Sequence, residues 1–375
     1  MIPFLIENIS LFEIWPHLLI AISTAFVTAL LLLLFQRQIA SLMHHRDDGL
    51  AVQASHYGNP LRLGGIAVFS GLAAAVLLGG GQGTWVPTLV IVSAGPVFFA
   101  GLLEDMGWRV SSTRRLAAAF VSAALAMLTL GFWVTRADLP GLDQALNFAP
   151  LAVLLTLILS AGFCHATNLV DGMNGLAAIV VISASVGMWV IARDAEGAGD
   201  LAILAAVLAA AMAGFLLLNW PFGKLFLGDA GSYGVGHVLI WIGIGLAANA
   251  PEISMPALLL ILFWPIADTL HSIFRRLASK SPVFMPDRMH LHQKMRRCIE
   301  IMILGGAHRR RSNPLATLAL MPLIVMPVIA GVALADYVLT AWATLALFVT
   351  LFGLTHVGIT RLACRSRRKP SVTSH

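Results

Sequence analysis

The chain has 375 residues, of which 58% are hydrophobic and 11% carry a charge, and its formal net charge is +6. A soluble globular domain has about 25% charged residues, so the composition excludes that class and indicates a polytopic membrane protein. The positive charge does not indicate nucleic-acid binding, because Lys and Arg in a membrane protein concentrate in its cytoplasmic loops.

Apolar runs long enough to cross about 30 Å of hydrocarbon follow one another along the chain. They predict an all-α, polytopic integral membrane protein with about 11 transmembrane helices. We expect one membrane domain over residues 1–360 and a basic tail over 361–375. The predicted spans are 17–35, 64–80, 87–103, 116–132, 150–166, 176–192, 201–218, 233–248, 255–272, 314–334 and 338–360.

The distribution of Lys and Arg predicts the orientation of the chain in the membrane. Of the 24 such residues, all except Arg136 and Arg193 lie in alternate connections or in the C-terminal tail. Because the basic loops of membrane proteins face the cytoplasm, we expect the N-terminus outside and the C-terminus inside. The basic tail is also suited to contact anionic membrane lipid.

The first loop predicted to be cytoplasmic, 36–63, runs into the sequence LRLGG. Arg62 precedes Gly64 and Gly65 there, and a cation beside a flexible backbone suits phosphate binding. A simple entry into the next helix explains the same residues equally well.

Two adjacent carboxylates, Glu104 and Asp105, follow the third predicted span in the sequence LLED. Carboxylates in such a pair repel each other, and the arrangement suits a base or a metal ligand. The alternative is a solvated helix end whose charge is balanced by the arginines that follow it, Arg109, Arg114 and Arg115.

The most polar sequence between two apolar spans is NLVDGMNGLA, residues 168–177. Asn168, Asp171 and Asn174 recur every three residues, so a helical turn would place them on one face. That face would form a site for a metal or a polar ligand. The alternative is a pair of helix ends, where Asn or Asp followed by Gly is common.

The sequence FLGDAGS places Asp229 between Gly228 and Gly231. A carboxylate in this setting can bind a divalent cation while backbone amides face a phosphate. Phe226, just before it, could stack on a nucleobase. Glycines in membrane helices also serve close packing, which is the alternative function.

Two further motifs lie near the end of the chain. Asp268 and His271 lie three residues apart, Arg275 and Arg276 follow within two helical turns, and a structural ion pair is favoured over a catalytic role. The following loop, 273–313, contains DRMHLHQ, in which His290 and His292 would share one face of an extended segment. If the segment is helical instead, His292 and Arg296 would share a face. Imidazole and guanidinium groups suit contacts with phosphate or metal, and all of these motifs fall on the side predicted to be cytoplasmic.

The motifs LRLGG, LLED, NLVDGMNGLA, FLGDAGS and DRMHLHQ, in this order, resemble those of the polyprenyl-phosphate N-acetylhexosamine-1-phosphate transferases. The resemblance implies transfer of a phosphosugar from a UDP-sugar to undecaprenyl phosphate with release of UMP. It also implies Mg²⁺ as cofactor, with Mn²⁺ as a substitute, and a homodimer in the bacterial inner membrane. The implied active site faces the cytoplasm and uses loops 36–63, 104–115, 168–175, 219–231 and 273–313.

The resemblance assigns roles by position. Asp229 corresponds to the metal-binding aspartate, and Asp171 to an active-site aspartate close to the metal. Glu104 and Asp105 correspond to an acidic pair whose first member deprotonates the lipid phosphate. The residues that the resemblance and the motifs place at the substrates are Arg62, Asn168, Asn174, Asn219, Phe226, Arg288, His290 and His292.

Three positions depart from the family pattern. Glu104 replaces the usual aspartate, which leaves open whether it or Asp105 is the base. Asn174 replaces a second aspartate, and an amide can bind a ligand but cannot act as a base. Gln293 replaces the third histidine of the phospho-MurNAc-pentapeptide transferases, which favours a simple donor such as UDP-GlcNAc. The alternatives are that pentapeptide enzyme or a transporter of an anionic lipid, although transport sites usually lie near the bilayer midplane.

Overall fold

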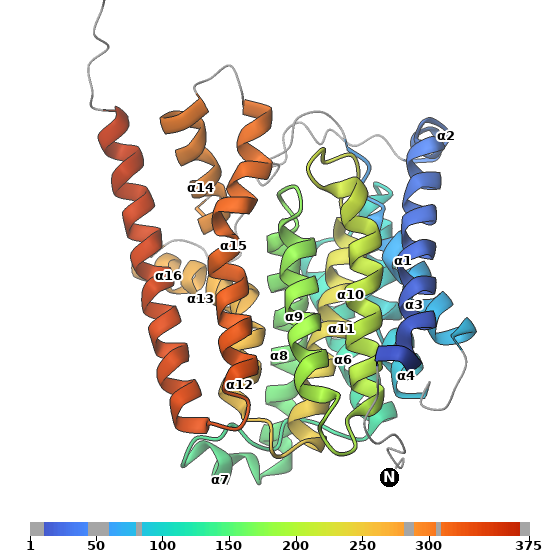
Figure 1. The fold of residues 1–375 in the computed structure, drawn as a ribbon, viewed down its shortest axis with the longest axis vertical. Coiled ribbons are helices and arrows are strands. Elements are labelled where there is room, and N and C mark those ends of the chain that lie inside the picture. Colours follow the sequence, from blue (N-terminus) through green and yellow to red (C-terminus); the bar gives the residue numbers. More distant parts are fainter. Residues whose placement is uncertain (1–10, 44–59, 80–84, 281–288, 305–308, 368–375) are drawn as a thin grey trace, which may run out of the picture.

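The protein is an all-helical bundle. The computed structural model describes residues 11–43, 60–79, 85–280, 289–304 and 309–367. Most of its helices run roughly parallel or antiparallel to one another (Figure 1). Within the described ranges, β pairing is limited to one isolated parallel bridge between Leu61 and Leu225. The predicted all-α class is therefore confirmed, and the number of long apolar helices fits a polytopic membrane protein.

The helices follow the chain in this order: α1 Leu11–Leu34, α2 Gln36–Leu42, α3 Gly64–Leu78, α4 Trp85–Ser93, α5 Gly95–Asp105, α6 Ser112–Leu130, α7 Leu142–Leu146, α8 Ala149–Val170, α9 Leu176–Ala192, α10 Gly199–Asn219, α11 Gly228–Asn249, α12 Met255–Ile261, α13 Phe263–Ala278, α14 Leu291–Ile299, a π-helix Glu300–Leu304, α15 Arg309–Ala333 and α16 Val338–Arg367.

Each predicted apolar run falls on one helix or on a bent pair of helices. In the part of the chain that the structure describes, 7 helices are long and apolar enough to cross a membrane, or up to 9 if each bent pair forms one span. The apolar helices α3 and α9 are shorter, with 15 and 17 residues. The predicted number of about 11 spans and the predicted orientation of the termini stay predictions.

The ninth predicted run is not one straight helix. It divides at Leu262 into α12 and α13, which meet at a bend of 85°. Pro265 in the first turn of α13 has no N–H to donate back toward α12, which favours a kink at this point. Figure 1 shows α13 lying across the direction of the long helices, near α14.

Helix α11 is the centre of the bundle. Its membrane-span segment is entirely buried, and it contacts α3, α5 and α8. At the crossing with α3, a Cβ atom added to Gly65 would lie 2.3 Å from the Cα of Gly231. The two backbones therefore approach as closely as glycine allows, the use of glycine that is common in membrane helices.

The connections that carry the polar motifs lie together. The connection from α8 to α9 and that from α10 to α11 are at the same end of the bundle as α2, opposite α7 (Figure 1). This arrangement agrees with the prediction that the motifs share one side of the membrane.

Candidate active site

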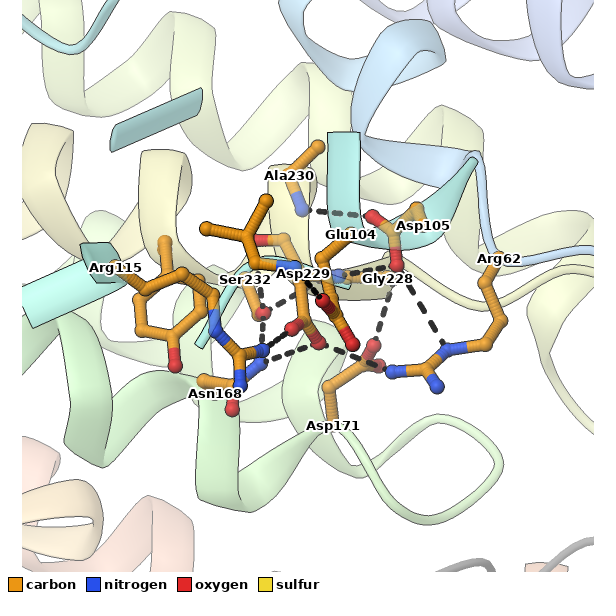
Figure 2. Close-up of polar contacts among 12 residues, drawn as sticks. Arg62, Glu104, Asp105, Arg115, Asn168, Asp171, Gly228, Asp229, Ala230 and Ser232 are labelled. Carbon is orange, nitrogen blue, oxygen red and sulfur yellow. Dashed lines mark hydrogen bonds and ion pairs between the residues drawn. The ribbon is translucent and has the colours of Figure 1, made fainter. Parts of the chain in front are cut away.

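Side chains from four of the five motifs meet around Asp229 at the start of α11 (Figure 2). Arg62 donates from Nη2 to Asp229 Oδ1 over 3.0 Å. Asn168 donates from Nδ2 to the same oxygen over 3.1 Å. The Oδ2 atom of Asp171 accepts the backbone N–H of Gly228 at 3.0 Å. The structure thus brings five of the predicted site residues into one cluster: Arg62, Asp105, Asn168, Asp171 and Asp229.

Asp105 holds the first turn of α11. Its Oδ1 accepts the N–H of Asp229 at 2.9 Å, and its Oδ2 accepts the N–H of Ala230 at 2.8 Å. These N–H groups have no partner within the helix, and a carboxylate at a helix N-terminus is also favoured by the helix dipole. Gly228 makes the approach feasible, because its φ is +73° and an added Cβ would lie 2.6 Å from Asp105 Oδ2.

Glu104 and its neighbour Asp105 accept hydrogen bonds from different segments of the chain. The Oε2 atom of Glu104 accepts the backbone N–H of Val110 at 2.5 Å, whereas Asp105 faces α11. Glu104 is 9% exposed and Asp105 is 3% exposed. The two carboxylates predicted to act as a pair thus have separate environments.

Asp229 is surrounded by positive charge. It is 4% exposed and forms ion pairs with Arg62 and, through Oδ2, with Nη1 of Arg115. A buried carboxylate requires such partners, because removing its charge from water is costly. The guanidinium of Arg115 also lies 5.7 Å from the centre of the Tyr233 ring, so α6 and α11 are joined at this point.

Arg115 was not identified as a site residue from the sequence, where it was considered only as a balancing charge. The same holds for Ser232, whose Oγ accepts from Asn168 Nδ2 at 2.8 Å and donates to the Gly228 carbonyl at 2.7 Å. Their only sequence signal was proximity to a motif, since Arg115 follows LLED and Ser232 ends FLGDAGS.

The environment of Asp171 favours its neutral form. Burial raises the pKa of its carboxyl group from 3.8 to about 7, although Arg62 and the N–H groups of Gly228 and Leu227 oppose the shift. Loss of solvation disfavours the charged form of an acid. This carboxylate therefore changes its protonation state near neutral pH.

The cluster contains two carboxylates that could hold a divalent metal ion such as Mg²⁺ together with a substrate. Asp229 and Asp171 supply carboxylate oxygens, which are the ligands Mg²⁺ prefers, and Asp171 contacts Gly228, the residue before Asp229. Among the described residues, no three His, Cys, Asp or Glu side chains converge into a metal site. Mg²⁺ commonly takes only one or two carboxylates from the protein and completes its shell with water and substrate phosphates.

The predicted helical face of Asn168, Asp171 and Asn174 is not formed, because α8 ends at Val170 and Asp171 is its C-cap. Gly175, with a φ of +78°, is the N-cap of α9. The two helix ends of the alternative interpretation are therefore present, and Asn168 and Asp171 at the first of them also reach Asp229 and Gly228. Asn174 contacts the next connection instead, where its Nδ2 donates to the Pro221 carbonyl at 2.8 Å.

Asn219 and Phe226 lie in the interior beside the cluster. Asn219 is 2% exposed, accepts the Gly175 N–H at 2.6 Å and donates to the Leu225 carbonyl at 2.7 Å. Phe226 is also 2% exposed. Asn219 thus joins the 171–175 and 219–225 connections, and the predicted uridine contacts of both residues stay predictions.

The glycines of LRLGG direct the chain into α3. The N–H of Gly64 donates to the Phe226 carbonyl at 2.8 Å, and the N–H of Gly65 donates to the Leu227 carbonyl at 2.9 Å. These amides are engaged within the protein, so the helix-entry interpretation holds for them. The same backbone pairing places Arg62 beside Asp229.

The histidine motif forms a separate cluster. Nδ1 of His290 lies 3.0 Å from Oδ2 of Asp268, and Nδ1 of His292 lies 3.6 Å from the same oxygen. The two rings are stacked with their centres 5.5 Å apart, although α14 begins at Leu291 and the segment is not the extended one for which a shared face was predicted. Asp268 contacts the histidines, whereas an ion pair with the arginines of α13 was the favoured prediction. Arg288 lies outside the described residues.

Comparisons with known proteins agree with the motifs. The family model of glycosyl transferase family 4 matches residues 87–247. A Bacillus subtilis (strain 168) protein described as a probable undecaprenyl-phosphate N-acetylglucosaminyl 1-phosphate transferase is 30% identical over 66% of this chain and 67% of its own length. The undecaprenyl-phosphate alpha-N-acetylglucosaminyl 1-phosphate transferase of Yersinia pestis is 30% identical over 79% of both chains.

A third relative has a different lipid in its name. The decaprenyl-phosphate N-acetylglucosaminephosphotransferase of Mycolicibacterium smegmatis is 31% identical over 66% of each chain. The matched part of the family model contains LLED, NLVDGMNGLA and FLGDAGS, whose side chains meet at Asp229. The chain therefore belongs to glycosyl transferase family 4 and is an enzyme of the phosphosugar-transferase type.

Proposed function

We propose that the protein transfers GlcNAc-1-phosphate from UDP-GlcNAc to undecaprenyl phosphate and releases UMP. The reaction takes place at the cytoplasmic face of the bacterial inner membrane, as the first membrane step of O-antigen or another cell-surface polysaccharide. The observation that carries the proposal is the convergence of Arg62, Arg115 and Asn168 on Asp229. The names of the relatives supply the substrate class.

The negative charges of the two substrates determine what the active site must do. An oxygen of the lipid phosphate attacks the β-phosphorus of the sugar nucleotide, and the bond from that phosphorus to the UMP oxygen breaks. Because both reactants are anions, the main tasks are charge neutralisation and positioning. Arg62 and Arg115 supply two cations at one point, and guanidinium groups bind phosphate oxygens in a fixed geometry. An aspartyl intermediate is a competing route through the same residues.

Mg²⁺ would be held by Asp229 and Asp171. When bound, it supplies further positive charge to the diphosphate and the leaving group. Binding to either carboxylate requires the ionised form, and for Asp229 it also requires a new arrangement of the arginines that now contact it.

Glu104 is the better candidate for the base that deprotonates the lipid phosphate. Both carboxylate oxygens of Asp105 accept N–H groups of α11, so protonation of Asp105 would weaken the start of that helix. Oε2 of Glu104 accepts the N–H of Val110, in the connection that follows α5, so proton transfer at Glu104 would leave the first turn of α11 in place. We assign the structural role to Asp105 and the proton transfer to Glu104.

The direct test is UMP release from purified protein in detergent, with undecaprenyl phosphate, Mg²⁺ and one donor at a time. UDP-GlcNAc, other UDP-N-acetylhexosamines and UDP-MurNAc-pentapeptide form the donor set, and Mn²⁺ replaces Mg²⁺ in a parallel series. Release that depends on lipid, metal and UDP-GlcNAc is the expected result. Release with the pentapeptide alone would assign the other branch of the family, and lipid transport without any release would overturn the proposal.

A further inference from the structure

Asp268 is the centre of a second buried polar cluster, at the start of α14. Its Oδ2 lies 3.0 Å from Nδ1 of His290, and its Oδ1 accepts the N–H of Leu291 at 3.2 Å. Asp268 is 2% exposed, His290 3% and His292 1%. A buried carboxylate is costly unless it is paired, and here one carboxylate contacts both histidines of the motif and the backbone between them.

The carboxylate determines the tautomer of His290. An ionised carboxylate can only accept hydrogen bonds, so the 3.0 Å contact requires the proton of His290 to be on Nδ1. The other ring nitrogen, Nε2, is then an acceptor in the neutral ring and becomes a donor when the ring is protonated. The orientation and the chemistry of His290 therefore both depend on Asp268.

The same carboxylate also fixes the backbone of the motif. His290 is the N-cap of α14, and Leu291 is the first residue of the helix. A negative charge at this position is favoured by the helix dipole. The 85° bend before α13 turns Asp268 out of the line of α12, and Figure 1 shows α13 and α14 close together between α15 and α16. Asp268 thus connects the bent helix to the histidine motif.

We propose that Asp268 is a positioning residue for the phosphosugar transfer, which holds His290 in the Nδ1–H tautomer and keeps His290 and His292 in the orientation that binds the sugar-nucleotide diphosphate. The inference rests on the proposed function and on the family resemblance, which places His290 and His292 at the substrates. A purely structural role would limit Asp268 to stabilising the first turn of α14. The two roles make different predictions for an amide at this position.

The test variant is Asp268→Asn. Its amide oxygen can still accept the Leu291 N–H, but its NH₂ group would then face Nδ1 of His290, donor against donor. His290 must change to the Nε2–H tautomer to restore the hydrogen bond. We expect Asp268→Asn to fold and to lower kcat for UMP release by about tenfold or more, as loss of the residue that orients a functional histidine commonly does.

A matched control is Asp200→Asn in α10. Asp200 is also a buried carboxylate, 8% exposed, and lies in the first turn of its helix, but it contributes to neither polar cluster. The Asp200→Asn variant is expected to have the kcat and the histidine tautomers of the wild type. Asp268→Glu keeps the negative charge, so it should retain the Nδ1–H tautomer and more activity than Asp268→Asn.

The second readout is ¹⁵N NMR of histidine-labelled protein, with the His290 signals assigned by their loss in His290→Gln. A change from the Nδ1–H to the Nε2–H signature in Asp268→Asn, together with the drop in kcat, supports the inference. An unchanged tautomer, or equal activity loss in Asp268→Asn and Asp268→Glu, overturns it. Wild-type UMP release tests the proposed function, whereas the tautomer tests Asp268, so the two can fail separately.

Discussion

The carboxylate of Asp105 accepts the backbone N–H of Asp229 at 2.9 Å, so one acidic residue caps the first turn of the helix that carries the other. The second oxygen of Asp105 accepts the next N–H group, that of Ala230. Glu104, the preceding residue, contacts Val110 instead. Two adjacent carboxylates that look equivalent in the sequence are therefore separated into a structural residue and a candidate base.

This separation predicts opposite effects for two substitutions. Asp105→Ala should lower the free energy of unfolding by about 1–3 kcal/mol, because two N–H groups at the start of α11 lose their acceptor. Glu104→Gln should keep the thermal stability of the wild type but lower kcat by about 100-fold or more. Thermal unfolding and UMP release, measured on the same preparations, check both. An active Glu104→Gln enzyme beside a stable, inactive Asp105→Asn enzyme would reverse the assignment.

Arg115 offers a test of the charge around Asp229. Arg115→Ala removes one of the two guanidinium groups that contact this carboxylate, and we expect kcat/KM to fall by about 100-fold. Arg115→Lys keeps the charge but not the planar guanidinium, so its activity should be intermediate.

The neighbouring Arg114 is the matched control, since it is exposed and lies in the same turn of α6. Arg114→Ala should retain wild-type activity. Wild-type activity in Arg115→Ala would remove Arg115 from the site.

The sequence alone was sufficient to group four of the five motifs, because polar residues at the ends of apolar spans are few and the order of the spans predicts that they share one side. It did not separate the histidine motif, which contacts Asp268 instead. It could not reveal that Arg115 contacts Asp229, since that contact joins α6 to α11 across the bundle. The orientation of Asn174 depended on α8 ending at Val170. The spacing of the polar residues could not predict that end, because the same spacing is compatible with a helix that continues, and tertiary contacts decide where the helix stops.

The crossing of α3 and α11 predicts a strong effect for Gly65→Ala. The added methyl group would lie 2.3 Å from the Gly231 backbone, so the helices must separate and the first turn of α11 must move with them. We expect a loss of folded protein, or a lower unfolding temperature with lower activity. Gly162→Ala in α8 is the control, because an added Cβ there meets nothing within 4 Å. Equal stability in the two variants would contradict the close contact of α3 with α11.

The protonated form of Asp171 favours the folded state, whereas metal binding requires the ionised form. The pKa of Asp171 is raised from 3.8 to about 7 by burial, so between about pH 4 and pH 7 the folded protein holds a proton that the unfolded chain has released. The stability that this proton contributes is lost as the pH rises through that interval. Above pH 7 the folded protein carries a buried carboxylate, which Asp171→Asn would replace by a neutral amide of the same shape.

Asp171→Asn should therefore be more stable than the wild type at pH 8, by about 1–3 kcal/mol, with a smaller difference at pH 5. The variant should release little UMP at either pH, because an amide is a poor ligand for Mg²⁺. Thermal unfolding in detergent without metal at both pH values provides the measurement. Asp194→Asn is the control, since the Asp194 side chain is 70% exposed, and it should show no such pH dependence. A destabilised Asp171→Asn protein at pH 8 would show that the Asp171 carboxylate supports the fold through its bond to Gly228 more than its burial opposes it.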